Sequence, residues 1–175
     1  MSTQQQTAFD PAMAKRELHE EWQATAPGWQ RWMDTMESAD GSGKLSQILV
    51  EAAPLRPGNA VLDVGAGYGE PGLPAARAVA PGGRVVLQDR ARDMLDVARV
   101  RVEAARLSDV EFTYLEGDAE ELDLPSGSFD AIVSRAALMD CYDIVGTSRR
   151  LRSFLKPGGR IAACVWSTPE AVAFA

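Results

Sequence analysis

Apolar residues recur along this chain in two distinct patterns. From Asn59 onward, short runs of mostly apolar residues alternate with longer amphipathic stretches. A short, nearly continuous apolar run is typical of a strand covered on both faces, whereas apolar residues every three or four positions indicate a helix. The pattern predicts five strands, at Ala60 to Val64, Arg84 to Gln88, Val110 to Leu115, Phe129 to Ser134 and Arg160 to Trp166.

Helical stretches lie between these strands, near Pro71 to Ala80, Arg92 to Leu107 and Asp143 to Lys156. The sequence Pro-Gly-Gly-Arg occurs twice, from Pro81 and from Pro157, where glycine ends a helix and an apolar strand follows at once. Parallel neighbouring strands need crossover connections, and these helices supply them. We therefore expect an α/β fold, a Rossmann-like parallel sheet with helices on both faces.

The N-terminal third of the chain has a different, entirely helical pattern. Asp10-Pro11 is typical of an N-cap followed by proline at the first helical position, and it predicts a helix to about Thr25. We expect Pro27-Gly28 to interrupt that helix before further helical stretches follow. The predicted organisation is a helical cap over residues 1–53 and a ligand-binding core over residues 54–175.

A glycine-rich segment, Gly65-Ala66-Gly67-Tyr68-Gly69, follows the first predicted strand. Glycines at alternate positions allow a tight turn and a close approach of the backbone to a ligand. The next helix offers unpaired N–H groups to an anion, such as the carboxylate of an amino-acid-bearing cofactor. Asp63, two residues before the first glycine, is placed to attract an ammonium or sulfonium group. The alternative is a turn that only connects a strand to a helix.

Acidic residues also follow the next two strands. Asp89 can accept hydrogen bonds from both hydroxyls of an adenosine ribose, or it can be the N-cap of the helix that starts near Ala91. Asp118 can accept from an exocyclic amine while the N–H of Ala119 meets a ring nitrogen, which would bind adenine, or it can be a plain turn aspartate. Parallel sheets bind ligands at the carboxyl ends of their strands, so we expect Asp63, Asp89 and Asp118 at one site.

The span from about Asn59 to Trp166 resembles the class I S-adenosylmethionine-dependent methyltransferases, particularly the branch of the ubiquinone and menaquinone biosynthesis C-methyltransferases. Asp63 to Gly69 match the family's glycine motif, Asp89 its ribose-binding acid, and Asp118-Ala119 its adenine-side motif. The resemblance implies a strand order of 3-2-1-4-5 and methyl transfer from S-adenosylmethionine to a small-molecule acceptor. It also implies cofactor contacts at Asp63, Gly65, Ala66, Gly67, Gly69, Asp89, Arg90, Asp118, Ala119 and Ser134.

The resembled family usually completes its sheet with a further helix and an antiparallel pair of strands. This sequence stops nine residues after Trp166, which indicates either a fragment or an abbreviated domain. The strand from Arg160 to Trp166 would then be an exposed edge with unpaired backbone groups. We expect the chain to self-associate through this edge, pairing with another copy or with the residual tail from Ser167 onward.

Two other functions fit parts of the same sequence. Gly67 to Gly72 also fits a dinucleotide-binding pattern and Asp89 suits the ribose of NAD, which would indicate an oxidoreductase. Asp63 and the Asp118-Ala119 motif have no role in that scheme. A non-catalytic module that keeps the cofactor fold without turnover is the other alternative.

No catalytic residue is assigned, because methyl transfer needs an aligned acceptor and exclusion of water rather than a dedicated nucleophile. His19 lies among glutamates on a predicted solvated helix face, which favours a surface residue over a general base. Trp22, Trp29 and Trp32 have helical spacing. Such a stripe is typical of packing, although the N-terminal helices of the resembled branch also shape the acceptor pocket.

Composition narrows the possible partners. A 175-residue chain with 46% hydrophobic and 25% charged residues is typical of one globular domain, and a net charge of -7 disfavours nucleic acid. Cys141, Cys164 and His19 are too few and too scattered for a zinc site or a disulfide framework, so no metal is expected. No apolar run approaches the roughly 18 residues that span a bilayer, and the first residues lack a signal-peptide pattern, which indicates a cytoplasmic protein.

Overall fold

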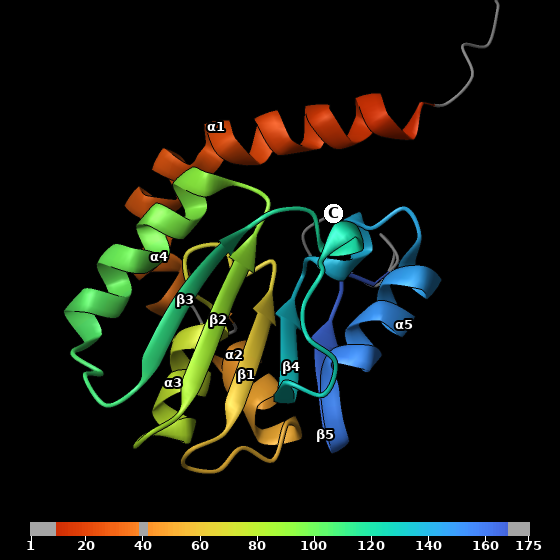
Figure 1. Ribbon diagram of the computed structural model, residues 1–175. Coiled ribbons are helices and arrows are strands. Elements are labelled where there is room, and N and C mark those ends of the chain that lie inside the picture. Colours follow the sequence, from red (N-terminus) through yellow and green to blue (C-terminus); the bar gives the residue numbers. More distant parts are fainter. Residues whose placement is uncertain (1–9, 39–41, 168–175) are drawn as a thin grey trace, which may run out of the picture.

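Five parallel strands form the centre of the molecule, and their order confirms the predicted fold. The computed structural model describes residues 10–38 and 42–167 (Figure 1). The strand order is β3-β2-β1-β4-β5, with every neighbouring pair parallel. The strand bounds are β1 Ala60–Val64, β2 Arg84–Asp89, β3 Glu111–Glu116, β4 Phe129–Arg135 and β5 Leu155–Cys164.

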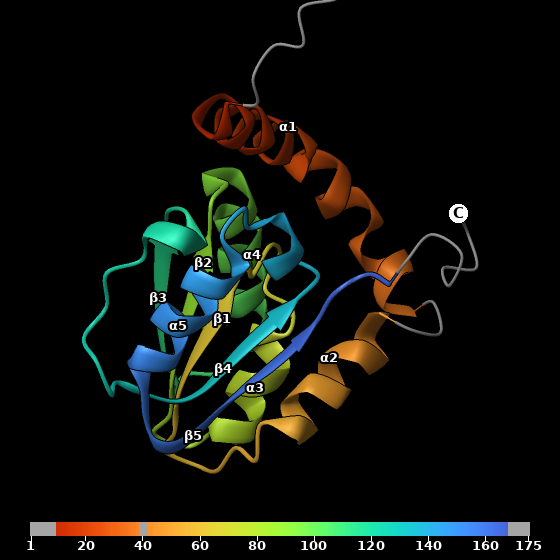
Figure 2. The same cartoon turned by 90° about the vertical axis from the view of Figure 1, so that its right-hand side faces the viewer.

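Helices cover both faces of this sheet (Figure 2). Val61, Val85 and Val133 pack under α2, α3 and α4, whereas the alternate residues Leu62 and Ile132 pack under α5. Full burial of such an aliphatic side chain contributes about 1.5–3 kcal/mol, so the alternation itself holds both layers in place. The helix bounds are α1 Pro11–Ser38, α2 Ser42–Ala52, α3 Gly72–Val79, α4 Arg92–Ala105 and α5 Ile144–Phe154, with short 3₁₀ helices η1 Ala119–Glu121 and η2 Leu138–Asp140.

The longest helix, α1, lies across the carboxyl ends of the strands (Figure 1). Asp10 caps it as predicted, since its Oδ1 accepts the Ala12 N–H at 3.0 Å. The predicted interruption at Pro27-Gly28 is wrong, because α1 continues through Pro27 to Ser38. Trp22 and Trp29, on either side of the proline, pack against the same buried residues, Ala26, Ala91 and Met94. This packing supports the helix where proline removes a backbone hydrogen bond.

Strand β5 begins earlier than its apolar pattern indicates. It starts at Leu155 directly after α5, not at Arg160, and it ends at Cys164. Its register against β4 passes from Leu155 opposite Phe129 to Arg160 opposite Ala131, so the second Pro-Gly-Gly sequence forms an irregularity within the strand. The Lys156 ammonium lies 2.8 Å from Asp130 Oδ2 at this point. In the described sheet β5 is an edge strand, and the tail beyond Ser167 lies outside the described residues.

Candidate functional site

The turn between β1 and α3 requires glycine for its shape and for its surroundings. Gly65 has a φ of +67°, where L side chains are strained, and a Cβ at this position would overlap the Cβ of Ala137. Gly67 has a φ of +51°, and a Cβ there would have only the Met94 side chain nearby, at 3.5 Å. The first glycine therefore allows close packing, while the third residue of the turn leaves open space beside it.

The backbone N–H groups of this glycine turn already have acceptors within the protein. The Gly67 N–H donates to Asp89 Oδ2 at 2.8 Å, and the Ala66 N–H donates to the Gln88 carbonyl at 2.8 Å. The N–H groups of Gly69 and Glu70 both donate to the Ala66 carbonyl, at 2.8 and 3.1 Å. A dinucleotide turn presents free N–H groups to a pyrophosphate. This turn has instead used four of them to fix its own shape.

Asp89 holds the glycine turn from the end of the neighbouring strand β2. Its Oδ2 accepts the Gly67 N–H, and its Oδ1 accepts the Ala91 N–H at 2.9 Å. Burial raises the pKa of Asp89, while these two hydrogen bonds act to lower it. Each carboxylate oxygen keeps a further lone pair, so the side chain can also accept from a ligand hydroxyl. The contact to Ala91 and a ligand contact are therefore compatible.

Gln88 is a site residue that the sequence reasoning missed. Its Nε2 donates to the Gly117 carbonyl at 2.6 Å, and its Oε1 accepts a long hydrogen bond from the Gly65 N–H at 3.4 Å. The side chain is buried and joins the loops that follow β1 and β3. A polar residue at the end of an otherwise apolar run was the signal that could have identified it.

A cavity of about 390 Å³ lies at this edge of the sheet, within the size range of small-molecule sites. It is lined by six of the predicted cofactor contacts: Gly65, Ala66, Gly67, Asp89, Arg90 and Ala119. Side chains outside that prediction complete the walls, among them Trp22, Trp29, Leu45, Tyr68, Glu70, Gln88, Met94, Arg135, Asp140, Cys141, Cys164 and Trp166. The wall is thus mostly apolar and aromatic, with a few charged groups.

Asp63 lies beneath the glycine turn rather than on this cavity wall. Its carboxylate is fully buried next to Gly72, at the start of α3, and neither oxygen makes a well-formed hydrogen bond with a described residue. Burial raises the pKa of Asp63 well above its ordinary value, and the Gly72 N–H and the Arg135 charge only partly offset this effect. The start of α3 therefore faces a carboxylate of the protein itself, contrary to the expectation that it awaits a ligand carboxylate.

Gly69, Ser134 and Asp118 also lie outside the cavity wall. Ser134 is buried and its Oγ donates to the Val64 carbonyl at 2.8 Å, which joins β4 to β1 close to the site. A Cβ at Gly69 would meet Ala98 and Leu73 at 3.5 Å, so this glycine faces packed side chains. Ser134 and Gly69 therefore support the strand ends and the glycine turn on the side away from the cavity.

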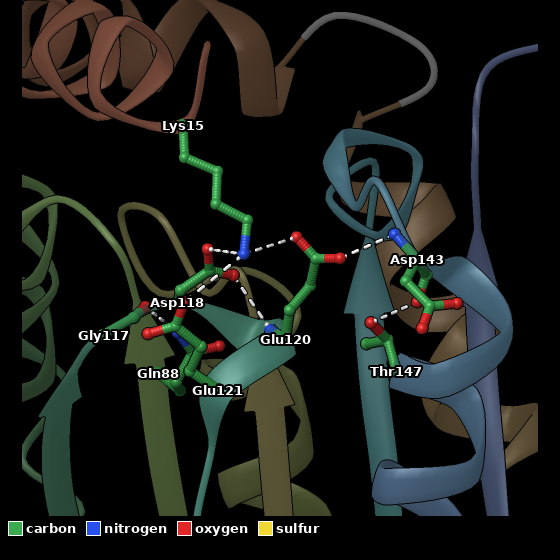
Figure 3. Close-up of polar contacts among 8 residues, drawn as sticks. All are labelled: Lys15, Gln88, Gly117, Asp118, Glu120, Glu121, Asp143 and Thr147. Atoms are coloured by element: carbon green, nitrogen blue, oxygen red, sulfur yellow. Dashed lines mark hydrogen bonds and ion pairs between the residues drawn. The ribbon is translucent and has the colours of Figure 1, made fainter. Parts of the chain in front are cut away.

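Asp118 takes part in an ionic cluster that ties α1 to the sheet (Figure 3). The Lys15 ammonium lies 3.0 Å from Asp118 Oδ2 and 2.9 Å from Glu120 Oε2. Asp118 Oδ1 accepts the Glu120 N–H at 2.9 Å, and Glu120 Oε1 accepts the Asp143 N–H. Burial acts to raise the pKa of Asp118, but the Glu120 N–H and Lys15 outweigh it and the pKa is lowered. The cluster therefore favours an ionised Asp118 beside the cavity.

An aromatic stack closes the cavity on the side of α1. The Trp29 ring lies 6.3 Å from the Trp22 ring and 5.7 Å from the Tyr68 ring, measured between centroids, and both pairs are stacked. Arg135 donates to the Tyr68 hydroxyl at 2.6 Å and to Ser46 Oγ on α2 at 3.0 Å. Trp32 is 61% exposed and takes no part. Two of the three tryptophans therefore combine packing with a place at the cavity.

The other sequence expectations concern single residues. His19 is half-buried on α1 and is not among the cavity-lining residues. Among the described residues, no three His, Cys, Asp or Glu side chains gather in a way that could hold a metal ion. None of the described helices is long and apolar enough to cross a membrane.

Comparison with known proteins assigns the family. A family model described as a methyltransferase domain matches residues 61–159, more than half of the chain. The chain belongs to this methyltransferase domain family. The match includes the glycine turn, Asp89 and Asp118, and it favours the methyltransferase interpretation over the oxidoreductase alternative.

Curated relatives lie in the predicted branch. The chain is 34% identical over 137 residues to the demethylmenaquinone methyltransferase of Symbiobacterium thermophilum, covering 78% of this chain and 54% of that protein. It is 34% identical over 124 residues to the ubiquinone/menaquinone biosynthesis C-methyltransferase UbiE of Pseudomonas entomophila, covering 70% of this chain and 48% of that protein. This methyltransferase domain thus spans about half the length of these curated relatives.

Solved structures agree with this assignment. A putative methyltransferase from Bacillus halodurans is 32% identical with a TM-score of 0.60, over 74% of this chain and 54% of that one. A putative methyltransferase from Haloferax volcanii, solved with the Trm112 methyltransferase activator, is 27% identical with a TM-score of 0.67, over 83% of this chain and 60% of that one. Together with the strand order, the matches confirm the class I S-adenosylmethionine-dependent methyltransferase fold, with S-adenosylmethionine as its cofactor.

Proposed function

We propose that this methyltransferase domain binds S-adenosylmethionine across the carboxyl ends of β1, β2 and β3 and transfers the methyl group to a small-molecule acceptor. The observation that carries the proposal is the cavity, because six of the positions implied by the family resemblance line it. The glycine turn supports S-adenosylmethionine over NAD, since four of its N–H groups already have partners and offer little to a pyrophosphate.

Different residues at the cavity would bind different parts of the cofactor. Asp89, with lone pairs left after its two backbone contacts, would accept hydrogen bonds from the ribose hydroxyls. The Ala119 N–H on the cavity wall would bind adenine, and the carboxylate of Asp118, which lies next to that wall and pairs with Lys15, would accept from the exocyclic amine. When bound, the cofactor supplies a methyl group activated by its sulfonium. The protein then has to align the acceptor and exclude water, which suits an aromatic wall without a nucleophile.

Residues 1–53 act in this proposal as a cap over the core of residues 54–175. Trp22 and Trp29 from α1 and Leu45 from α2 line the cavity, so the cap supplies part of the site. Lys15 attaches the same helix to the loop after β3. The cap would therefore contribute to the acceptor side and help to enclose the cofactor.

The acceptor we favour is a small, largely apolar molecule with a flat ring. The apolar part of the cavity wall includes Leu45, Trp29 and Trp166. Two relatives are named for methylation of demethylmenaquinone and for ubiquinone and menaquinone biosynthesis, which makes quinone-like rings the first compounds to test. A net charge of -7 supports an acceptor other than nucleic acid. We also propose that the domain is cytoplasmic and that copies pair through the edge strand β5.

Calorimetry followed by an activity assay tests this function. We expect the full chain to bind S-adenosylmethionine and S-adenosylhomocysteine, and not to bind NAD at the same concentration. Incubation with methyl-labelled S-adenosylmethionine and a panel of ring acceptors should then give a labelled product. Binding of NAD alone would overturn the proposal, whereas cofactor binding without product from any acceptor would favour the non-catalytic module.

A further inference from the structure

Glu70 is a cavity-lining carboxylate that the sequence reasoning left without a role. It follows the last glycine of the turn and is only 6% exposed. Its Oε1 lies 3.4 Å from Arg101 Nη2, a long contact, and its Oε2 is buried without a hydrogen-bond partner among the described residues. A buried carboxylate oxygen that lacks a donor destabilises a protein unless something else supplies one. The position at the cavity makes a ligand the natural donor.

The other carboxylates at the glycine turn are placed differently. Asp63 is fully buried beneath the turn and does not line the cavity. Asp89 lines the cavity, but both of its oxygens already accept backbone N–H groups. Asp140 also lines the cavity and has the Trp22 side chain as a hydrogen-bonding neighbour. Glu70 therefore combines a place at the cavity with an oxygen that still lacks a donor.

The nearby cations are held by other groups. Arg101 donates to the Tyr68 carbonyl at 2.9 Å as well as approaching Glu70, and Arg135 donates to Tyr68 and Ser46. Glu70 thus has one ion-pair contact, at 3.4 Å through Oε1, in a low-dielectric position where a second cation near Oε2 would be strongly attracted. S-adenosylmethionine carries two cationic groups, a sulfonium and an α-ammonium, and only the ammonium has N–H groups to donate.

We infer that Glu70 binds the α-ammonium group of the methionyl part of the cofactor, a role that the sequence analysis predicted for Asp63. The inference rests on the proposed function, since it needs S-adenosylmethionine in this cavity. Asp89 at the end of β2 and Glu70 at the far end of the glycine turn would then hold the two ends of one ligand, the ribose and the amino acid. Glu70 is a binding residue in this account and takes no part in bond making.

Three ligands separate this role from others. S-adenosylhomocysteine has the ammonium and the carboxylate, its decarboxylated analogue S-adenosyl-3-thiopropylamine has the ammonium alone, and 5′-methylthioadenosine has neither. We expect Glu70→Gln to weaken the first two by about 10- to 100-fold in calorimetry, the scale of a charge-assisted hydrogen bond, and to leave 5′-methylthioadenosine unchanged. Glu111→Gln, on an exposed residue of β3, is the matched control and should change none of the three.

Several outcomes would overturn the assignment. Equal weakening of all three ligands would show that Glu70 only supports the fold through Arg101. A loss for S-adenosylmethionine much larger than for S-adenosylhomocysteine would indicate a contact with the sulfonium instead. If Glu70→Gln bound every ligand with the affinity of the unaltered chain, the proposed role of Glu70 would be wrong, but the proposed function would be unaffected. If the unaltered chain bound none of them, the proposed function would fail and this inference with it.

Discussion

The Lys15 ammonium lies 3.0 Å from the Asp118 carboxylate, and this ion pair joins helix α1 to the loop that follows β3. Lys15 has a second carboxylate partner in Glu120 at 2.9 Å (Figure 3). Burial acts to lower the pKa of Lys15, but hydrogen bonds to Glu120 and Asp118 outweigh it and raise the pKa. The contact is thus fully charged at neutral pH, and it attaches the cap where adenine is proposed to bind.

Loss of this ion pair should loosen α1 more than the core. For Lys15→Met we expect the free energy of unfolding to fall by about 1 kcal/mol and the amides of α1 to exchange faster with deuterium, because the pair is only partly buried. Arg16→Gln, on the neighbouring exposed residue, is the control. Unchanged exchange in α1 would mean that Trp22 and Trp29 hold the helix without help from Lys15.

The glycine turn allows backbone strain to be separated from crowding. Gly65→Ala should destabilise the protein by about 1–3 kcal/mol and reduce cofactor affinity, because its Cβ would overlap Ala137. Gly58→Ala places a methyl group at a similar positive φ, +82°, but with nothing within 4 Å, so it should cost only about 1 kcal/mol and leave affinity unchanged. Urea unfolding and calorimetry check both variants. If Gly65→Ala and Gly58→Ala changed stability and affinity equally, crowding against Ala137 would make no contribution.

Asp89 connects β2, the glycine turn and the proposed ribose site. Asp89→Ala should weaken S-adenosylhomocysteine binding by about 1–3 kcal/mol in calorimetry, since a charge-assisted acceptor is removed. It also leaves the Gly67 and Ala91 N–H groups without their acceptor, so some loss of stability is expected. Asp96→Ala, on the exposed face of α4, should change neither property. If a folded Asp89→Ala variant bound S-adenosylhomocysteine with unchanged affinity, Asp89 would have a structural role only.

Two buried or half-buried aspartates should give opposite dependences of stability on pH. Burial raises the pKa of Asp63, so the folded state holds its proton more tightly and the free energy of unfolding declines as pH rises through that raised value. For Asp130, burial acts in the same direction, but the Ala60 N–H and Lys156 outweigh it and lower the pKa. Its contribution is therefore complete above the ordinary aspartate pKa and is lost as pH falls through the lowered value.

The two asparagine variants test these signs in urea unfolding between pH 3 and pH 8. We compare the free energy of unfolding of each variant with that of the unaltered chain at the same pH. For Asp63→Asn this difference should become more stabilising from acidic to neutral pH. For Asp130→Asn it should become more destabilising from acidic to neutral pH. A parallel pH profile for Asp63→Asn and the unaltered chain would mean that Asp63 does not titrate differently in the folded state.

Strand β5 predicts association between copies. Ile161 is 38% exposed on this edge strand of the described sheet, and Val165 and Trp166 just beyond it are more than half exposed. Unpaired strand edges with apolar side chains favour pairing. We expect concentration-dependent dimers in light scattering, and we expect Ile161→Lys to abolish them while Val100→Lys, on exposed α4, does not. A monomer at every concentration would contradict the predicted pairing.

The sequence predicted the sheet well because its signals are local. Strands β1 to β4 lie within one residue of their predicted bounds, since each is a mostly apolar run, and glycine or an acidic residue ends the first three runs. The continuity of α1 could not be predicted, because tertiary packing of Trp22 and Trp29 overrides the local effect of Pro27. The start of β5 was missed because Lys156 and the glycines after it are not apolar, and their pairing depends on Asp130 of another strand.

In the candidate site, too, the features set by local sequence could be predicted, and those that depend on contacts between distant segments could not. Gly65, Gly67 and Asp89 line the cavity because a strand's end fixes their position. The position of Asp63 at a strand end could be predicted, but the face of the strand could not, and the alternation of side chains along β1 places Asp63 under α3. Asp118 was expected near adenine, but its partner Lys15 comes from a helix distant in sequence. Gln88 carried a local signal, as a polar residue at the end of an apolar run, whereas Glu70 and Tyr68 can be recognised as site residues only from the fold, which brings three strand ends together.

The internal hydrogen bonds of the glycine turn also bear on the thermodynamics of binding. With its N–H groups already bonded to Ala66, Gln88 and Asp89, the turn has its final shape before a ligand arrives. A preorganised surface loses little conformational entropy on association, so this wall of the cavity adds affinity without a large ordering penalty. The cost of ordering applies instead to α1, the helix that brings Trp22 and Trp29 to the cavity. Differences in ligand residence time among variants should therefore follow the mobility of α1 rather than that of the turn.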